Sequence, residues 1–175
     1  MKQDKETKKV NTENQARKMA ECCSNLFTEF TFQDLTNAKP PSEKGVYVIK
    51  IKRKGKASPQ EMIEKTKQLI SGISWDLVVE FIMSRIKRLN NIGNCPIIYI
   101  GSAGTQERSK NTLKDRYEEL SNRHTAMYPI WVLLHFGWEL EFGWKKSNRP
   151  KQEEEELKIK YQKLHNGKLP ALVAR

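Results

Sequence analysis

The chain has 175 residues, and 37% of them are hydrophobic, including four Trp, six Phe and five Tyr that can fill the core of one domain. Lys and Arg number 32 against 21 Asp and Glu, and the resulting net charge of +11 favours a polyanionic partner. No run of about 18 apolar residues occurs, and no segment resembles a basic amphipathic anchor, which argues against a membrane partner.

Residues 1–40 are predicted to be a basic N-terminal arm with a helix. The arm begins with a run of Lys, Glu, Asn, Gln and Thr, a composition typical of disorder. Apolar residues at helical spacing predict a helix over 14–30, and Phe30 and Phe32 then alternate with polar residues as in a short extended segment. We expect the main domain to occupy residues 41–175.

Two strands and a helical insert come next. Residues 46–51 are rich in β-branched side chains and predict a strand, and the apolar run 96–101 predicts a second, buried strand. Between them, a Ser-Pro-Gln-Glu start and amphipathic spacing predict helices at 59–71 and 74–90. This insert, at about 57–92, either contacts nucleic acid or is a packing hairpin. The basic residues that would make such contacts are Arg85, Lys87 and Arg88.

Three helices and one strand complete the chain. Thr112 can cap a helix that runs to about residue 121, and a second helix is expected at about 126–136. The period-two pattern of 138–144 predicts a strand, and Pro150 begins a final helix. The predicted buried face of that helix consists of Leu157, Tyr161 and Leu164.

This order of elements predicts a mixed α/β (α+β) fold. We expect a small, roughly three-stranded mixed sheet flanked by helices, with the helical insert between the first two strands.

The three cysteines form no familiar pattern. Cys22 and Cys23 are adjacent, Cys95 stands alone, and no CxxC spacing occurs. The sequence therefore predicts neither a disulfide framework nor a zinc site, and we expect reduced thiols in a cytoplasmic protein.

Two tripeptides carry the functional signal. Gly45-Val46-Tyr47 lies at the first strand and Tyr99-Ile100-Gly101 at the second, and this pair resembles the signature of the GIY-YIG nuclease superfamily. The helix with Arg116 and a Glu in the last helix follow in the order of that family, so the resemblance covers about 44–172. It implies that residues 41–175 form a GIY-YIG-like domain that hydrolyses DNA phosphodiester bonds.

The resemblance also implies a role for each residue. Tyr47 and Tyr99 would face one site, where a Tyr hydroxyl helps to deprotonate the attacking water, and Arg116 would contact the scissile phosphate. A Glu in the last helix would hold one Mg²⁺, or Mn²⁺, that stabilises the leaving oxygen. Each residue also has a simple structural explanation: the tyrosines could pack a core. The carboxylates with which Arg116 could pair at the helix surface are Glu118 and Glu119.

The metal ligand is one of four consecutive glutamates, residues 153–156. Glu154 lies three positions before Leu157 and therefore on the predicted buried face of the helix. Glu153 lies four positions before Leu157 and remains the alternative. Glu155 and Glu156 are expected to be solvated.

The chain departs from the family pattern at three places. Tyr47 and Tyr99 lie 52 positions apart because of the insert, a length that loop entropy tolerates. Leu120 stands one turn after Arg116, where many relatives carry His or Tyr, so we assign the accessory base to His124 one turn further on. No Asn follows the Pro near the end of the chain.

Double-stranded DNA is the expected partner, although the sequence does not distinguish DNA from RNA. The basic residues expected to contact it are Lys52, Arg53, Lys114 and Arg123. A homodimer or two successive visits would let one small site cut both strands. A non-catalytic nucleic-acid-binding protein that retains the fold is the alternative, and an adaptor for an acidic protein is a third hypothesis.

Overall fold

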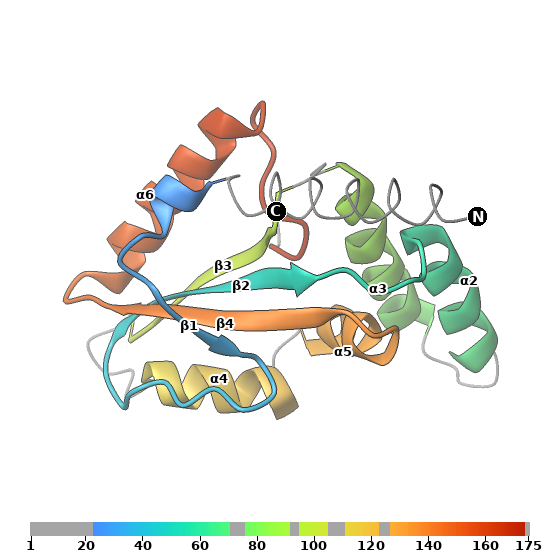
Figure 1. Ribbon diagram of the computed structural model, residues 1–175, viewed down its shortest axis with the longest axis horizontal. Coiled ribbons are helices and arrows are strands. Elements are labelled where there is room, and N and C mark those ends of the chain that lie inside the picture. The colour runs from blue at the N-terminus through green and yellow to red at the C-terminus, as the bar shows by residue number, and fades with distance from the viewer. Residues whose placement is uncertain (1–22, 71–75, 92–94, 105–110, 123–126, 174–175) are drawn as a thin grey trace, which may run out of the picture.

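The central strand of the protein is β2 (Gly45–Arg53), which lies between β3 (Ile97–Ala103) and β4 (Glu139–Lys146). A fourth strand, β1 (Thr31–Asp34), pairs with β4, and the sheet order is β1-β4-β2-β3 (Figure 1). The computed structural model describes residues 23–70, 76–91, 95–104, 111–122 and 127–173.

The sheet differs from the predicted one in two ways. It has four strands rather than three, because β1 is a four-residue edge strand with too short an alternating pattern to be recognised as part of the sheet. Between the described strands every pairing is antiparallel, so the prediction of a mixed sheet is wrong. Strand direction depends on the path of the connecting helices, which hydrophobic periodicity does not encode. The segment assigned to the arm, residues 1–40, thus supplies an edge strand.

The helices lie close to their predicted positions. They are α2 (Pro59–Ile70), α3 (Asp76–Arg88), α4 (Leu113–Asn122), α5 (Met127–His135) and α6 (Pro150–Leu164), with the 3-10 turns η1 (Ser24–Leu26) and η2 (Leu89–Asn91). The helical insert between the first two long strands is confirmed as α2, α3 and η2. The helix predicted over 14–30 is wrong for its described part, which holds only η1. Cys23 has a φ of 61°, in the left-handed region, and interrupts any right-handed helix there.

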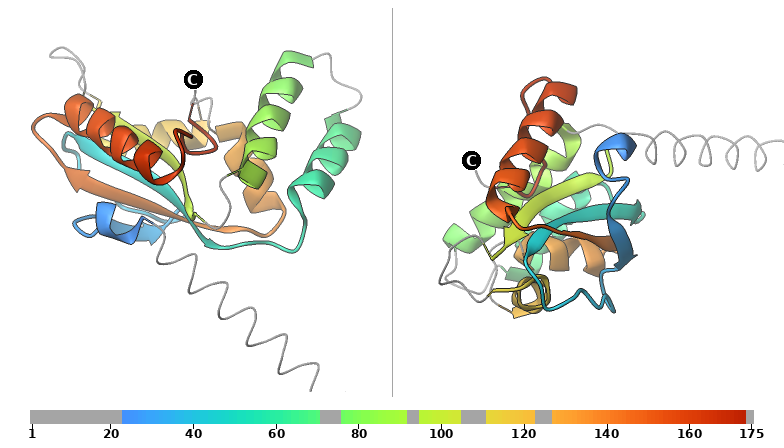
Figure 2. Two further views of the ribbon diagram at one scale, coloured as in Figure 1. Left: turned by 90° about the horizontal axis from the view of Figure 1, so that it is seen from above. Right: turned by 90° about the vertical axis from the view of Figure 1, so that its left-hand side faces the viewer.

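Helices cover both faces of the sheet. α6 lies across one face, α4 and α5 lie against the other, and the insert stands at one end (Figure 2). Alternate side chains of β2 enter the two layers: Val46 and Val48 pack on the α6 side, and Tyr47 and Ile49 pack on the opposite side. The motif tyrosine of β2 therefore belongs to the layer that also contains α4.

The buried face of α6 is mostly the predicted one. Leu157 and Tyr161 are buried, but Leu164 is 61% exposed. The helix ends at Leu164, and the chain turns away at Asn166 with a φ of 51°, so no element covers that side chain.

The insert packs against the domain through two of its arginines. Arg85, which is 9% exposed, donates a hydrogen bond of 2.8 Å to the carbonyl oxygen of Val173, and Arg88 donates one of 2.7 Å to the same oxygen. Lys87 is exposed. Arg85 and Arg88 thus anchor the C-terminal segment, as a packing hairpin would. Among the described helices, none has both the length and the apolar character of a membrane span.

Candidate active site

The structure brings the two motif tyrosines together on one face of the sheet. In the β2–β3 ladder, Tyr47 is opposite Gly101 and Tyr99 is opposite Ile49, so the tyrosines are diagonal neighbours. Their ring centroids are 5.8 Å apart with an interplanar angle of 22°. Tyr47 also stacks on Phe142 at 5.4 Å and is 1% exposed, whereas Tyr99 is half-buried.

Packing explains both motif glycines. A Cβ atom on Gly101 would lie 2.7 Å from Cζ and 2.8 Å from the hydroxyl oxygen of Tyr47. A Cβ atom on Gly45 would overlap the backbone carbonyl oxygen of Lys145 on β4 and lie 2.8 Å from Leu113. These glycines let the tyrosine pair and the strand neighbours approach closely.

Both tyrosine hydroxyls are held in the protonated form at neutral pH. Burial raises the pKa of Tyr47 well above its ordinary value of 10.0, and the hydrogen bond to Tyr99 raises it further. Burial also raises the pKa of Tyr99, but the hydrogen bond from Tyr47 opposes this effect. The charges of two further residues act on both hydroxyls in opposite directions: Arg116 lowers their pKa and Glu154 raises it.

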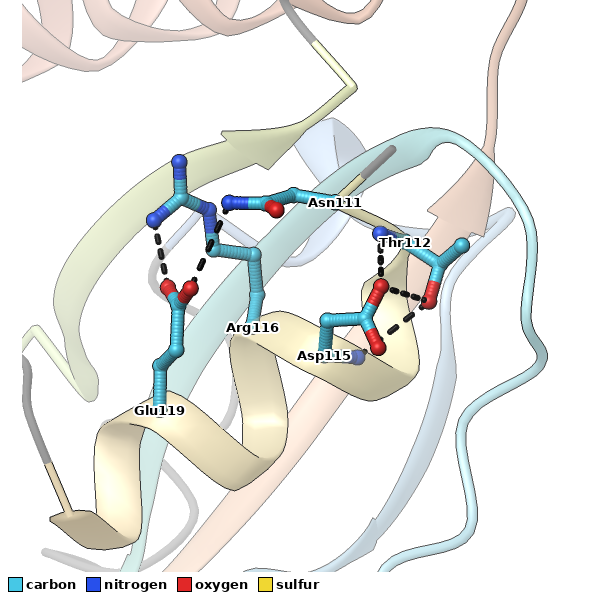
Figure 3. Close-up of polar contacts among 5 residues, drawn as sticks. All are labelled: Asn111, Thr112, Asp115, Arg116 and Glu119. Atoms are coloured by element: carbon cyan, nitrogen blue, oxygen red, sulfur yellow. Dashed lines mark hydrogen bonds and ion pairs between the residues drawn. The ribbon is translucent and has the colours of Figure 1, made fainter. Parts of the chain in front are cut away.

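Arg116 is positioned by a capped helix (Figure 3). Thr112 and Asp115 form a capping box at the start of α4: the Asp115 N–H donates to the Thr112 hydroxyl at 3.2 Å, and the Thr112 N–H donates to the Asp115 carboxylate at 2.7 Å. Leu113, which is fully buried, anchors the same turn. The cap and this anchor fix where α4 begins and therefore where Arg116 points.

The guanidinium of Arg116 is only partly satisfied. Nη1 forms an ion pair of 2.5 Å with Glu119, which also accepts a hydrogen bond of 3.3 Å from Asn111 (Figure 3). Nε of Arg116 is buried, and no acceptor for it is present in the described part of the chain. A buried donor of this kind is costly unless a ligand supplies an acceptor.

Glu154, on α6, is the buried glutamate of the four. It is 8% exposed, accepts a hydrogen bond from the Ser102 hydroxyl on β3, and forms an ion pair with Lys158 one turn along the helix. Glu153 instead pairs with Lys145 at 2.6 Å. Burial raises the pKa of Glu153, but hydrogen bonds from Lys145 and Ser147 outweigh it and hold that pKa below 4.5.

Glu154 offers an oxygen donor of the kind that a hard cation binds, but two lysines already lie against its carboxylate. Mg²⁺ is commonly bound by one or two carboxylates, with water and substrate phosphates completing its shell. Glu154 supplies the carboxylate and Ser102 a neighbouring hydroxyl. Lys158 contacts the same carboxylate, and Lys151 lies 3.9 Å from it, so a cation would have to displace these ammonium groups from the carboxylate oxygens.

The other predicted site residues are not gathered at the tyrosines. Lys52 and Arg53 lie at the far end of β2, about 20 Å from Tyr47 at about 3.3 Å per residue, and Arg53 forms an ion pair with Glu139. Lys114 is exposed on α4 with its ammonium 4.0 Å from Glu118. Two further predicted residues, Arg123 and His124, lie outside the described residues.

Two clefts lie near the starts of α4 and α6. One of about 610 Å³ lies between η1 and α6, where Arg149 and Glu153 line it, and one of about 360 Å³ lies beside the start of α4, where Lys44 and Thr112 line it. The turn at 147–148 lines both. Neither cleft is lined by the tyrosines or by Glu154.

Two residues of the site were not predicted. Ser102 follows the second motif directly, and Lys158 lies four positions after Glu154, so helical spacing could have indicated that ion pair. Glu119 was foreseen only as an alternative partner of Arg116. The contact of Ser102 with Glu154 joins β3 to α6 and has no signal in the sequence.

No family model matches the chain, and comparison with curated proteins and with solved structures finds no match either. Function must therefore be inferred from the residues of this site and their contacts.

Proposed function

We propose that this protein is a metal-dependent endonuclease that hydrolyses DNA phosphodiester bonds through a GIY-YIG-type site. The observation that carries the proposal is the stacked pair of Tyr47 and Tyr99 on β2 and β3. The charges of Arg116 on α4 and Glu154 on α6 both shift the pKa of these hydroxyls. A structural core alone does not require a guanidinium and a carboxylate within electrostatic range of a tyrosine pair.

The contacts favour Tyr99 as the group that takes the proton of the attacking water, after its own hydroxyl proton has passed to solvent. Tyr99 is the more exposed of the two tyrosines, and its oxygen receives the hydrogen bond from Tyr47, which stabilises its ionised form. The nearby charge of Arg116 acts in the same direction. Tyr47 then positions Tyr99 and is not itself the base.

Arg116 is the proposed phosphate contact because the N–H of its buried Nε has no acceptor among the described residues and can donate to a phosphate oxygen. Glu154 is the proposed ligand of Mg²⁺, or Mn²⁺, which when bound would stabilise charge on the leaving oxygen. His124 remains a proposed accessory base.

The proposed substrate is double-stranded DNA in the cytoplasm, and the net charge of +11 supports a polyanionic partner. A homodimer would present one site to each strand. Lys52, Arg53, Lys114 and Arg123 remain the proposed contacts with the DNA backbone.

A non-catalytic nucleic-acid-binding protein is the second candidate. Two observations favour it: Tyr47 is 1% exposed, as expected of a core residue, and Lys158 already pairs with the carboxylate proposed for the metal. This candidate predicts salt-sensitive binding of DNA without cleavage.

A nicking assay tests the proposal. Supercoiled plasmid and mixed-sequence genomic DNA are incubated with the protein in Mg²⁺, Mn²⁺ or EDTA, beside Glu154→Gln, Tyr99→Phe and Arg116→Ala. The control is Glu155→Gln, which removes an exposed carboxylate from the adjacent position of α6. We expect metal-dependent nicking that the three site variants lose and the control keeps. DNA binding without cleavage of either substrate would favour the second candidate.

A further inference from the structure

Three metal-binding side chains meet at the opposite end of β3 from Ser102. Cys23 precedes η1, Cys95 precedes β3, and His165 directly follows α6. The Cys23 sulfur is 3.7 Å from the Cys95 sulfur and 3.7 Å from Nε2 of His165. The three ligand atoms all lie within 4.8 Å of one another, and the two cysteines are buried thiols rather than a disulfide.

Both ring nitrogens of His165 lie near the Cys23 sulfur, Nε2 at 3.7 Å and Nδ1 at 4.0 Å. Nδ1 lies 2.7 Å from the carbonyl oxygen of Tyr161, which can only accept, so Nδ1 carries the proton and donates. Nε2 then carries the lone pair of the ring and lies 3.7 Å from the Cys23 sulfur. The ring is stacked on Tyr161 with centroids 3.9 Å apart, which fixes its plane. A ligating histidine commonly donates its other N–H to a backbone carbonyl in this way.

The spacing of the three atoms suits a tetrahedral zinc ion. Zinc–sulfur bonds of about 2.3 Å and zinc–nitrogen bonds of about 2.1 Å place tetrahedral ligands about 3.8 Å apart for two sulfurs and about 3.6 Å apart for sulfur and nitrogen. The observed separations of 3.7 Å agree with both values. A disulfide would require the sulfurs to close to about 2.05 Å and would give His165 no role.

We propose that Cys23, Cys95 and His165 bind one Zn²⁺, with a solvent molecule as the fourth ligand. Two thiolates and an imidazole are soft and borderline donors that select zinc over Mg²⁺. Each thiol releases one proton on binding, so two protons leave per zinc ion and the affinity falls as the pH falls.

The proposed zinc site cross-links three segments of the chain and does not depend on the proposed function. It joins the segment before η1, the start of β3 and the end of α6, which are 72 and 142 positions apart in the chain. Cys95 is about 23 Å along the chain from Ser102 at about 3.3 Å per residue, so this zinc ion cannot serve the Glu154 site. The sequence predicted no zinc site because it contains no CxxC spacing. The proposal of a zinc site depends instead on the distances between the three ligand atoms in the folded chain.

Titration of the reduced full-length protein with Co²⁺ or Zn²⁺, without nucleic acid, tests the proposal. Co²⁺ reports sulfur ligation through thiolate charge-transfer absorption, and Zn²⁺ displaces it. We expect one ion per chain, a higher midpoint of thermal unfolding with zinc, and an affinity lowered roughly 100-fold or more in Cys95→Ser and His165→Gln. The control is His135→Gln, at the exposed end of α5, which should bind zinc like the wild type.

His165 is half-buried and follows the last helix, so His165→Gln should remain folded if Cys95→Ser does not. Absence of thiolate absorption in the folded, reduced wild type would overturn the proposal. Equal affinity in His165→Gln and the wild type would also overturn it, and so would formation of a Cys23–Cys95 disulfide in air together with failure of the reduced protein to bind zinc.

Discussion

At the scale of single residues, Gly101 is packed tightly against the rings of Tyr47 and Tyr99. An alanine Cβ there would lie 2.7 Å from the Tyr47 ring and 2.8 Å from Tyr99, closer than carbon atoms pack. We predict that Gly101→Ala lowers the free energy of unfolding by about 1–3 kcal/mol, because the overlap forces the rings or the strand to move. Urea unfolding followed by tryptophan fluorescence measures this change.

The same substitution in a Tyr47→Leu background is the control for Gly101→Ala. Leucine lacks the ring atoms that the new methyl group would strike, so the alanine should cost less there. Equal losses in both backgrounds would show that contact with Tyr47 is not the cause.

The hydroxyl of Tyr47 should make stability depend on pH in the alkaline range. Burial holds its folded pKa well above the ordinary value of 10.0, so the folded state keeps the proton that the unfolded state releases. This contribution to stability is fully present below about pH 10 and is lost as the pH rises toward the folded pKa. We predict that the free energy of unfolding falls more steeply above about pH 10 in the wild type than in Tyr47→Phe.

Urea unfolding of both proteins between about pH 8 and about pH 11 measures that difference. Parallel curves would contradict it, because they would mean that the Tyr47 hydroxyl has the same pKa in the folded and unfolded states.

At the scale of elements, two helices begin with the same kind of capping box but have different neighbours. Thr112 and Asp115 cap α4, which carries Arg116, and Ser58 and Glu61 cap α2 in the insert. We predict that Thr112→Ala and Ser58→Ala each lower the free energy of unfolding by about 1 kcal/mol. Thr112→Ala alone should also lower the nicking rate, because fraying of the first turn of α4 displaces Arg116.

The two variants are controls for one another. Urea unfolding compares their stability, and nicking at a temperature where both are folded compares their activity. An equal loss of nicking in Ser58→Ala would mean that general destabilisation, and not the position of α4, governs the rate.

Most helices and strands of the structure were predicted by hydrophobic periodicity, and one strand was not. The alternating and helical patterns predicted β2, β3, β4 and α2 to α6 within a few residues, and the burial of Glu154 followed from its spacing to Leu157. The edge strand β1 was missed as part of the sheet, since four residues with one exposed face give almost no pattern. A pattern reports which side of an element is buried, but not which element covers it.

At the scale of the whole molecule, the net charge of +11 predicts that the proposed binding of DNA is driven by the release of counterions. Each basic side chain that neutralises a phosphate contributes about −0.9 to the slope of log K against log salt concentration. Lys114 lies on α4, two positions before Arg116, and Lys52 lies at the far end of β2.

We predict that Lys114→Ala and Lys52→Ala each reduce the magnitude of that slope by about 1, measured by fluorescence anisotropy in EDTA. Lys163→Ala, an exposed change near the end of α6, is the control and should leave the slope unchanged. If Lys114→Ala changes the slope and Lys52→Ala does not, the bound duplex reaches only the α4 end of the sheet.

The sequence by itself determined the order of the elements, most of their boundaries and the faces they bury, because these depend on interactions between residues a few positions apart. The tertiary structure alone decided the rest: the fourth strand, the Tyr47–Tyr99 pair with Arg116 and Glu154, the contact of Ser102 with Glu154, and the group of Cys23, Cys95 and His165. Most of these contacts join residues more than 50 positions apart. Such contacts depend on the path of the chain through space, which no local spacing encodes.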